Sequence, residues 1–173
     1  MEIKLAKTAG FCFGVKRAVD TVYKEAEKNK ETIYTFGPII HNEQVVEDLE
    51  RNGVFVVNTI EELKSLKAGT TVIVRSHGVG KFIYDLMEEC GLKIVDATCP
   101  FVKKIHRIVE RESKAGKRII IIGNDKHPEV EGIKGWVCGK ATVIETFDEA
   151  HAFTAEEDEQ LCIVSQTTFN YNK

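Results

Sequence analysis

The chain contains one sequence pattern twice, and this repeat limits its possible folds more than any other feature does. Cys12 is followed 29 residues later by His41, in a His-Asn-Glu triplet. Cys99 is followed 28 residues later by His127, in a His-Pro-Glu triplet, and the two cysteines are 87 residues apart in a chain of 173. A period of this length is too long for a solenoid and indicates a duplicated small domain.

Both copies show the same alternation of helical and extended segments. Apolar residues recur at helical spacing after each cysteine, between Val15 and Ala26 and again between Val102 and Val109. The short apolar segments that we expect to be strands are 32–36, 54–57, 71–75, 93–96, 118–122, 142–145 and 161–165. Strands and helices that alternate at these lengths predict an α/β fold of two small parallel-sheet units, residues 1–97 and residues 98–173.

Residues able to do chemistry fall where the predicted strands end or the next helices begin. Parallel α/β units bind ligands beyond the carboxyl ends of their strands, so these residues are expected to gather at one place. They are Cys12, His41, His77, Cys99, His127, Glu129 and Thr167.

Cys12 and Cys99 each stand immediately before a predicted helix. The helix dipole and the free amides at a helix start stabilise a thiolate, which suits a metal ligand or a nucleophile. Cys90, Cys138 and Cys162 are instead expected to be small buried apolar residues. The chain has no Cys-x-x-Cys pair, which argues against a structural zinc site. The start of the chain does not resemble a signal peptide, so we expect a cytoplasmic protein with reduced cysteines.

Three histidines, His41, His77 and His127, lie at predicted strand ends and could bind an anion or a metal. Imidazoles and helix starts around a small space favour a phosphate or diphosphate. The sequence contains no nucleotide P-loop and no dinucleotide fingerprint. We interpret His106 and His151 as ordinary surface residues.

Glu129 shares the second histidine loop, and Glu43 holds the equivalent place in the first. A glutamate in a first helical turn either interacts favourably with the helix dipole or, in a closed site, relays protons.

The net charge of −3 gives no reason to expect a nucleic acid partner. The longest apolar run is far too short to span a membrane.

Six motifs in this order resemble those of the 4-hydroxy-3-methylbut-2-enyl diphosphate reductases. They are Gly10-Phe11-Cys12-Phe13-Gly14-Val15, Ile40-His41-Asn42, Ser76-His77-Gly78-Val79, Asp96-Ala97-Thr98-Cys99-Pro100, His127-Pro128-Glu129-Val130-Glu131-Gly132 and Gln166-Thr167-Thr168. The resemblance extends from Met1 to about Phe169.

The resemblance implies an iron–sulfur oxidoreductase with a [4Fe-4S] cluster. It would remove the hydroxyl of an allylic diphosphate and release isopentenyl and dimethylallyl diphosphate, the last step of the non-mevalonate isoprenoid pathway. By position, Cys12 and Cys99 would hold the cluster and Glu129 would deliver protons. Thr167 would help to hold the substrate and relay protons, and His41, His77 and His127 would bind the diphosphate. The electrons would come from an external donor such as a ferredoxin or flavodoxin.

The resemblance also implies three similar domains in pseudo-threefold arrangement, each with one cluster cysteine. This chain carries two of the repeats, the second incomplete, so the third cysteine is expected beyond Lys173. We therefore interpret the chain as a fragment that lacks reductase activity on its own. Two rival hypotheses remain at this point: a zinc-dependent hydrolase that uses His41, His77, His127 and Glu129, and a phosphate-binding module without a cluster.

Overall fold

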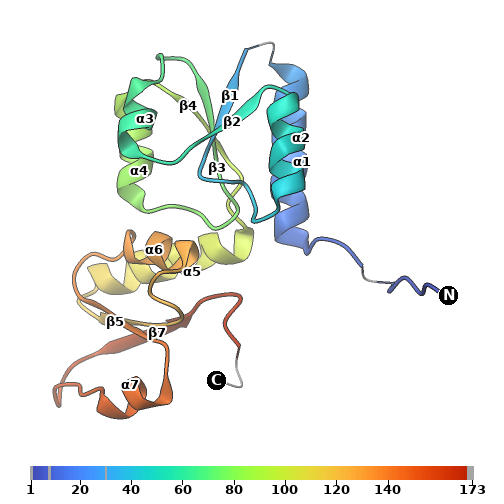
Figure 1. Ribbon diagram of the computed structural model, residues 1–173. Helices are drawn as coiled ribbons and strands as arrows, with labels where there is room; N and C mark the ends of the chain where they lie inside the picture. The colour runs from blue at the N-terminus through green and yellow to red at the C-terminus, as the bar shows by residue number, and fades with distance from the viewer. Residues whose placement is uncertain (1, 8, 30, 171–173) are drawn as a thin grey trace.

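A computed structural model of the chain describes residues 2–7, 9–29 and 31–170, and it contains two parallel sheets one above the other (Figure 1). The first sheet has the strand order β2-β1-β3-β4 and the second has the order β6-β5-β7. These sheets confirm the predicted α/β fold class of two small parallel-sheet units. The sheets lie on either side of residue 97, but the outer limits of the predicted domains, residues 1 and 173, lie outside the described residues.

In the described part of the chain, four short strands and four helices form the first unit. The strands are β1 (Ile33–Phe36), β2 (Val54–Val57), β3 (Thr71–Val74) and β4 (Lys93–Asp96). The helices are α1 (Phe13–Lys28), α2 (Glu43–Arg51), α3 (Ile60–Ser65) and α4 (Lys81–Glu89). Helices α1 and α2 cover one face of the sheet, and α3 and α4 cover the other (Figure 1).

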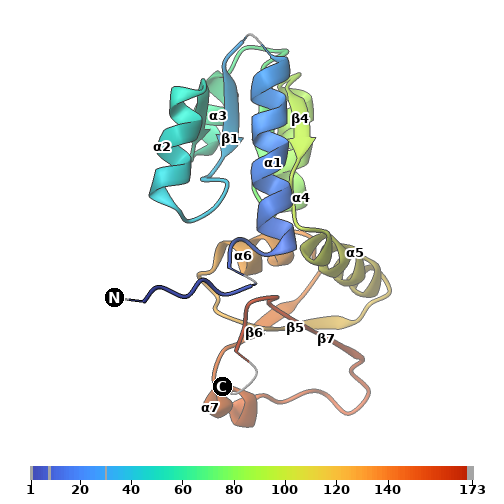
Figure 2. The same ribbon diagram turned by 90° about the vertical axis from the view of Figure 1, so that its right-hand side faces the viewer.

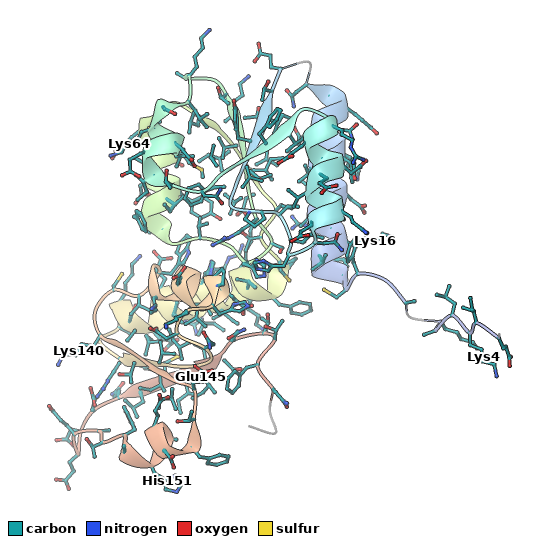
Figure 3. The ribbon with its side chains drawn as sticks, in the orientation of Figure 1. Lys4, Lys16, Lys64, Lys140, Glu145 and His151 are labelled. Carbon is teal, nitrogen blue, oxygen red and sulfur yellow. The ribbon has the colours of Figure 1, made fainter. Side chains whose placement is uncertain are left out.

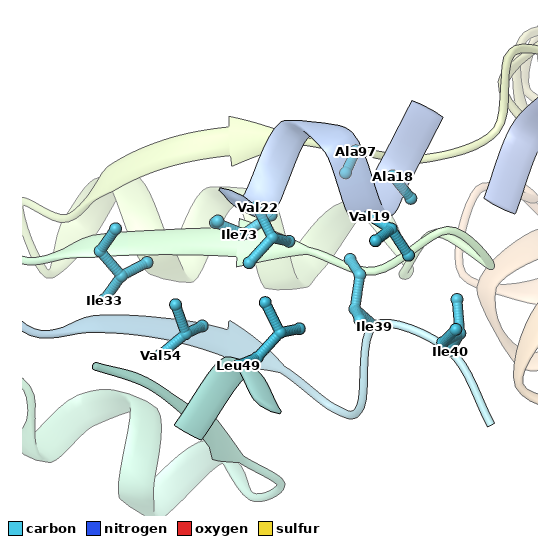
Figure 4. Packing of buried hydrophobic residues seen from close by; sticks show 10 residues of the cluster. All are labelled: Ala18, Val19, Val22, Ile33, Ile39, Ile40, Leu49, Val54, Ile73 and Ala97. Atoms are coloured by element: carbon cyan, nitrogen blue, oxygen red, sulfur yellow. The ribbon is translucent and has the colours of Figure 1, made fainter. Parts of the chain in front are cut away.

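Apolar side chains fill both spaces between this sheet and its helices. Ala18 and Val22 of α1 pack with Leu49 of α2 against strand residues on one side (Figure 4). Leu63 of α3 and Met87 of α4 pack against the opposite face. All five side chains are almost completely buried, as expected for a sheet covered by helices on both faces. The first sheet is therefore a rigid platform for the loops at its strand ends.

Within the described residues, the second unit repeats this plan with one strand and one helix fewer. Its elements are α5 (Pro100–Lys114), β5 (Arg118–Ile122), α6 (Pro128–Lys134), β6 (Ala141–Ile144), α7 (Phe147–Ala152) and β7 (Leu161–Ser165). In both units the strand after the first helix lies in the middle of its three repeated strands. The helices α3 and α7 even begin with the same capping box, formed by Thr59 and by Thr146. The duplicated topology confirms the sequence repeat.

The two units differ at the outer edge of the third repeated strand. In the first unit β4 pairs along the whole of β3. Within the described part of the chain, no strand pairs with the corresponding edge of β7. Ile163 in the middle of β7 is 66% exposed. The second sheet therefore presents an open strand edge beside an exposed apolar side chain.

Helices α5 and α6 lie between the two sheets and carry the contact between the units (Figures 1 and 2). Gly135, after α6, packs so closely on Gly80 that a Cβ atom at Gly135 would overlap the Gly80 Cα. The indole Nε1 of Trp136 donates to the carbonyl of Val79 at 2.8 Å. The ring of Trp136 also meets that of Tyr84, with centroids 5.8 Å apart. These contacts fix the second unit against the loop that follows β3.

Two expectations about the second unit were wrong. His106 is only 3% exposed and stacks on Trp136, because it lies on the same helical stripe as Val102 and Val109. Cys138 is exposed, because it lies in a bend after α6. Helix α6 ends at Lys134, and Val137 beyond it packs partly into the core. Among the described residues, no helix is long and apolar enough to cross a membrane.

The burial of His106 predicts that acid destabilises the protein. Burial lowers the pKa of His106 from 6.5 to about 4; Asp96 opposes this shift and Lys103 adds to it. The unfolded chain therefore binds a proton between these values that the folded chain does not. The contribution of neutral His106 to the free energy of unfolding is therefore complete above pH 6.5. It is lost as the pH falls toward 4, by about 1.4 kcal/mol per pH unit.

Urea unfolding at a series of pH values measures this effect. Between pH 6.5 and 5 we expect the free energy of unfolding to fall by about 2 kcal/mol because of His106 alone. The variant His106→Gln should show a shallower slope. An unchanged slope in that variant would contradict the neutral buried state of His106.

Candidate active site

The two cysteines of the repeat lie at neighbouring helix starts. Cys12 is the N-cap residue of α1 and Cys99 is that of α5, and neither thiol caps a backbone N–H group. A Cβ atom at Gly14 would lie 2.5 Å from the Cys99 Sγ, so this thiol sits where a side chain of α1 would be. Both cysteines are free, with Cys12 exposed and Cys99 half-buried. The structure thus brings both predicted ligands to the junction of α1 and α5, whose starts lie close together in Figures 1 and 2.

The close approach at Gly14 predicts that Gly14→Ala disturbs this site. The added methyl group overlaps the Cys99 Sγ, so α1 must move or the thiol must turn away. We expect a loss of about 1–3 kcal/mol in the free energy of unfolding, measured by urea titration. Gly132→Ala is the matched control, because its new Cβ would meet neighbours only at 3.5 Å or more. Equal effects of the two substitutions would contradict the close approach.

Ser76 joins the cysteine site to two of the histidine loops. Its carbonyl accepts a hydrogen bond from the N–H of Cys99 at 2.9 Å. Its buried hydroxyl donates to the carbonyl of Ile39 at 3.1 Å, two residues before His41. Because His77 directly follows Ser76, the two histidines and Cys99 are held by one set of bonds.

The three predicted histidines form a row. The ring centroids of His41 and His77 are 5.2 Å apart, and those of His77 and His127 are 5.5 Å apart. The Nδ1 of His77 is buried and has no hydrogen-bond partner. Burial lowers the pKa of His77 to about 4, with smaller contributions from the positive charges of Arg75, His41 and His127. The central imidazole is therefore neutral at pH 7.

His127 is the N-cap residue of α6 and is tied to Glu129. Its Nδ1 accepts a hydrogen bond from the backbone N–H of Glu129 at 3.1 Å. A neutral imidazole that accepts at Nδ1 carries its proton on Nε2 and can donate it to an anion. Glu129 itself is only 1% exposed, and its carboxylate accepts from the N–H of Thr167 at 2.6 Å and from the Thr167 hydroxyl at 2.8 Å. Thus His127, Glu129 and Thr167 form one connected network.

The structure distinguishes Glu43 from Glu129, which hold equivalent places in the sequence repeat. Glu43 is exposed in the first turn of α2, whereas Glu129 is buried. His151 is an exposed residue of α7 at the outer end of the second unit, as expected (Figure 3). Cys90 and Cys162 pack against apolar clusters, and burial raises the pKa of Cys162. Sequence reasoning gave no role to Ser76 or to Arg75, the partly buried cation two residues before His77.

A zinc site is not supported by the arrangement of these residues. Across residues 2–7, 9–29 and 31–170, no three or more His, Cys, Asp or Glu side chains are grouped so that they could hold a metal ion. The carboxylate of Glu129 is already engaged by Thr167. The zinc-dependent hydrolase hypothesis therefore has no support in the structure.

Comparisons with known proteins give a consistent result. The sequence matches the protein family described as LytB protein over residues 3–173. A relative from Caldanaerobacter subterraneus subsp. tengcongensis, named 4-hydroxy-3-methylbut-2-enyl diphosphate reductase, is 50% identical over 169 residues. The match covers 97% of this chain and 58% of the relative. A relative of the same name from Clostridioides difficile is 46% identical over 170 residues, covering 98% of this chain and 60% of the relative.

Two solved structures have the same fold. One is described as (E)-4-hydroxy-3-methyl-but-2-enyl diphosphate reductase, the terminal enzyme of the non-mevalonate pathway; its TM-score is 0.83 at 40% identity, over 98% of this chain and 59% of that one. The other is an E-1-hydroxy-2-methyl-but-2-enyl-4-diphosphate reductase from Plasmodium falciparum, with a TM-score of 0.89 at 30% identity, over 96% of this chain and 51% of that one. The chain spans about 58% of the length of the first of the curated relatives.

Proposed function

Because the chain belongs to the LytB protein family, we propose that it serves the reductive dehydroxylation of 4-hydroxy-3-methylbut-2-enyl diphosphate. In this reaction the substrate takes up two electrons and two protons. The hydroxyl leaves as water, and a carbon of the allyl group receives the other proton. The products are isopentenyl and dimethylallyl diphosphate. The observation that carries the proposal is the meeting of Cys12 and Cys99 at two neighbouring helix starts, of which that of Cys99 is hydrogen-bonded to Ser76, the residue before His77.

Cys12 and Cys99 would hold a [4Fe-4S] cluster. Their free thiols at helix starts, with Cys99 against a glycine, fit the thiolate ligands that such clusters need. When bound, the cluster supplies electrons one at a time and a Lewis-acidic iron. Since the described residues offer no complete metal site, a further cysteine from a third, similar domain would complete the ligand set.

The histidine row would bind the diphosphate of the substrate. His127 offers its Nε2 proton, because its Nδ1 is occupied by the backbone of Glu129. His77 is neutral at pH 7 and can donate one hydrogen bond without adding charge. His41 completes the row at the end of the first repeated strand. The row would thereby fix the diphosphate beside the cysteine site.

Glu129 would pass protons to the substrate. Its burial keeps bulk water away from the carboxyl group, and Thr167 fixes both carboxylate oxygens. Thr167 is an exposed residue just after β7, and its hydroxyl, bonded to Glu129, can carry a proton outward. Together Glu129 and Thr167 would form a short proton relay from the second unit to the substrate.

Electrons would come from outside the protein. We assign this role to a small one-electron carrier such as a ferredoxin or flavodoxin, in the cytoplasm. The small-molecule substrate is the other partner that the reaction requires.

A chimaera tests the proposed function. In it, this chain replaces the matching N-terminal part of the Caldanaerobacter relative, to which it is 50% identical. After anaerobic reconstitution with iron and sulfide we expect the visible absorption of an iron–sulfur cluster and conversion of the substrate to the two products by a chemical one-electron reductant. A chimaera that folds and binds pyrophosphate but takes up no iron would support the phosphate-binding module instead.

A further inference from the structure

A cavity of about 400 Å³ lies between the two units and contains an unpaired arginine. Its walls come from the strand ends of the first sheet, from the start of α4 and from α6. Arg75, directly after β3, is the cationic side chain among the residues that line it. The carboxylates in the same wall belong to Glu61 and Glu131.

The side chain of Arg75 is fixed in place without a counter-ion. Its Nη1 lies where a Cβ atom of Gly37 would be, 2.5 Å from that position. Gly37 has φ = 71°, so both its conformation and this contact favour glycine. The Nε of Arg75 is buried and has no hydrogen-bond partner. Glu131 lies near enough to affect the pKa of Arg75, but among the described residues no carboxylate lies within the 4.0 Å of an ion pair.

Arg75 lies two residues before His77, and its cavity is also lined by Pro128, the residue directly after His127. Burial is the largest cause of the lowered pKa of His77. The positive charge of Arg75 is the next largest, ahead of the charges of His41 and His127 in the row itself. Because His77 is neutral at pH 7, it cannot balance the charge of an anion. A diphosphate carries several negative charges, so the site needs a permanent cation close by.

We propose that Arg75 supplies the positive charge of the diphosphate site, which it shares with the histidine row. A partly buried guanidinium without a counter-ion raises the free energy of the empty protein, and the negative charge of an arriving anion lowers it again. The inference rests on the proposed function, since it takes the row as the place of the diphosphate. Arg75 acts through its charge and needs no direct contact with the substrate.

Binding of inorganic pyrophosphate to the full chain at low salt tests the inference. We expect Arg75→Met to weaken binding roughly tenfold or more, and Arg75→Lys to stay within about threefold of the wild type. Binding should also depend less on salt in Arg75→Met, because one cation has been removed. Lys64→Met is the matched control: it removes one positive charge from the exposed face of α3 (Figure 3) and should leave the affinity unchanged.

A purely structural role of Arg75 gives a different result. If Arg75 only filled the space over Gly37, Arg75→Met would lower the melting temperature and leave the pyrophosphate affinity and its salt dependence unchanged. That result would overturn the inference, as would equal weakening by Lys64→Met. If His127→Phe abolished binding while Arg75→Met did not, the inference would fall and the proposed diphosphate site would stand. Absence of binding in the wild-type chain would count against both.

Discussion

In the chimaera, Cys99→Ser is expected to abolish both the iron–sulfur absorption and the reductase activity, and Cys12→Ser should do the same. Serine keeps the shape of the side chain, but its hydroxyl stays protonated at neutral pH and is a poor ligand for iron. The half-buried Cys99 fits against Gly14, a contact that its serine variant keeps without the thiolate. Iron content, visible absorption and substrate turnover measure the loss.

Two other cysteines provide the controls for that experiment. Cys90 and Cys162 pack beside apolar clusters in the first and second units. Their alanine variants should keep the cluster, at a cost of about 1–2 kcal/mol in stability. A chimaera that loses its iron through Cys162→Ala and keeps it in Cys99→Ser would show that the ligand assignment is wrong.

Glu129→Gln should lower kcat by about two to four orders of magnitude while the cluster and the substrate affinity are kept. The glutamine oxygen can still accept the N–H of Thr167, and its amide can donate to the Thr167 hydroxyl, so the network keeps its shape. What is lost is a group that can give up a proton. Steady-state kinetics of the chimaera separate this effect on kcat from any effect on KM.

The sequence repeat supplies a matched control for this variant. Glu43 holds the equivalent place in the first unit but is exposed in the first turn of α2. Glu43→Gln should therefore leave kcat unchanged. Equal kinetics of the two variants would remove Glu129 from the proton path.

Much of the fold was predictable because it depends on local patterns. The segments 54–57, 93–96, 118–122 and 161–165 are strands in the structure with the same limits as predicted. Short apolar runs between turn residues are sufficient to find such strands. The failure at His106 has a physical cause: its polarity suggested the surface, whereas its place on the buried stripe of α5 determined its burial.

The candidate site was predictable only in its main residues. The repeat pointed to Cys12 and Cys99, and the structure places them at neighbouring helix starts. The roles of Ser76 and Arg75 depend on contacts with residues near Gly37 and Ile39, some 37 positions earlier in the chain. No local pattern encodes such contacts, because they arise only when β1 and β3 lie side by side.

The open edge of β7 affects how the protein behaves when it is concentrated. An unpaired strand edge offers N–H and C=O groups to any extended segment that approaches it. The five residues of β7 include neither proline nor a charged side chain, which are the usual protection against such pairing, and Ile163 adds an apolar contact. Self-association of the chain should therefore involve β7 and increase with protein concentration.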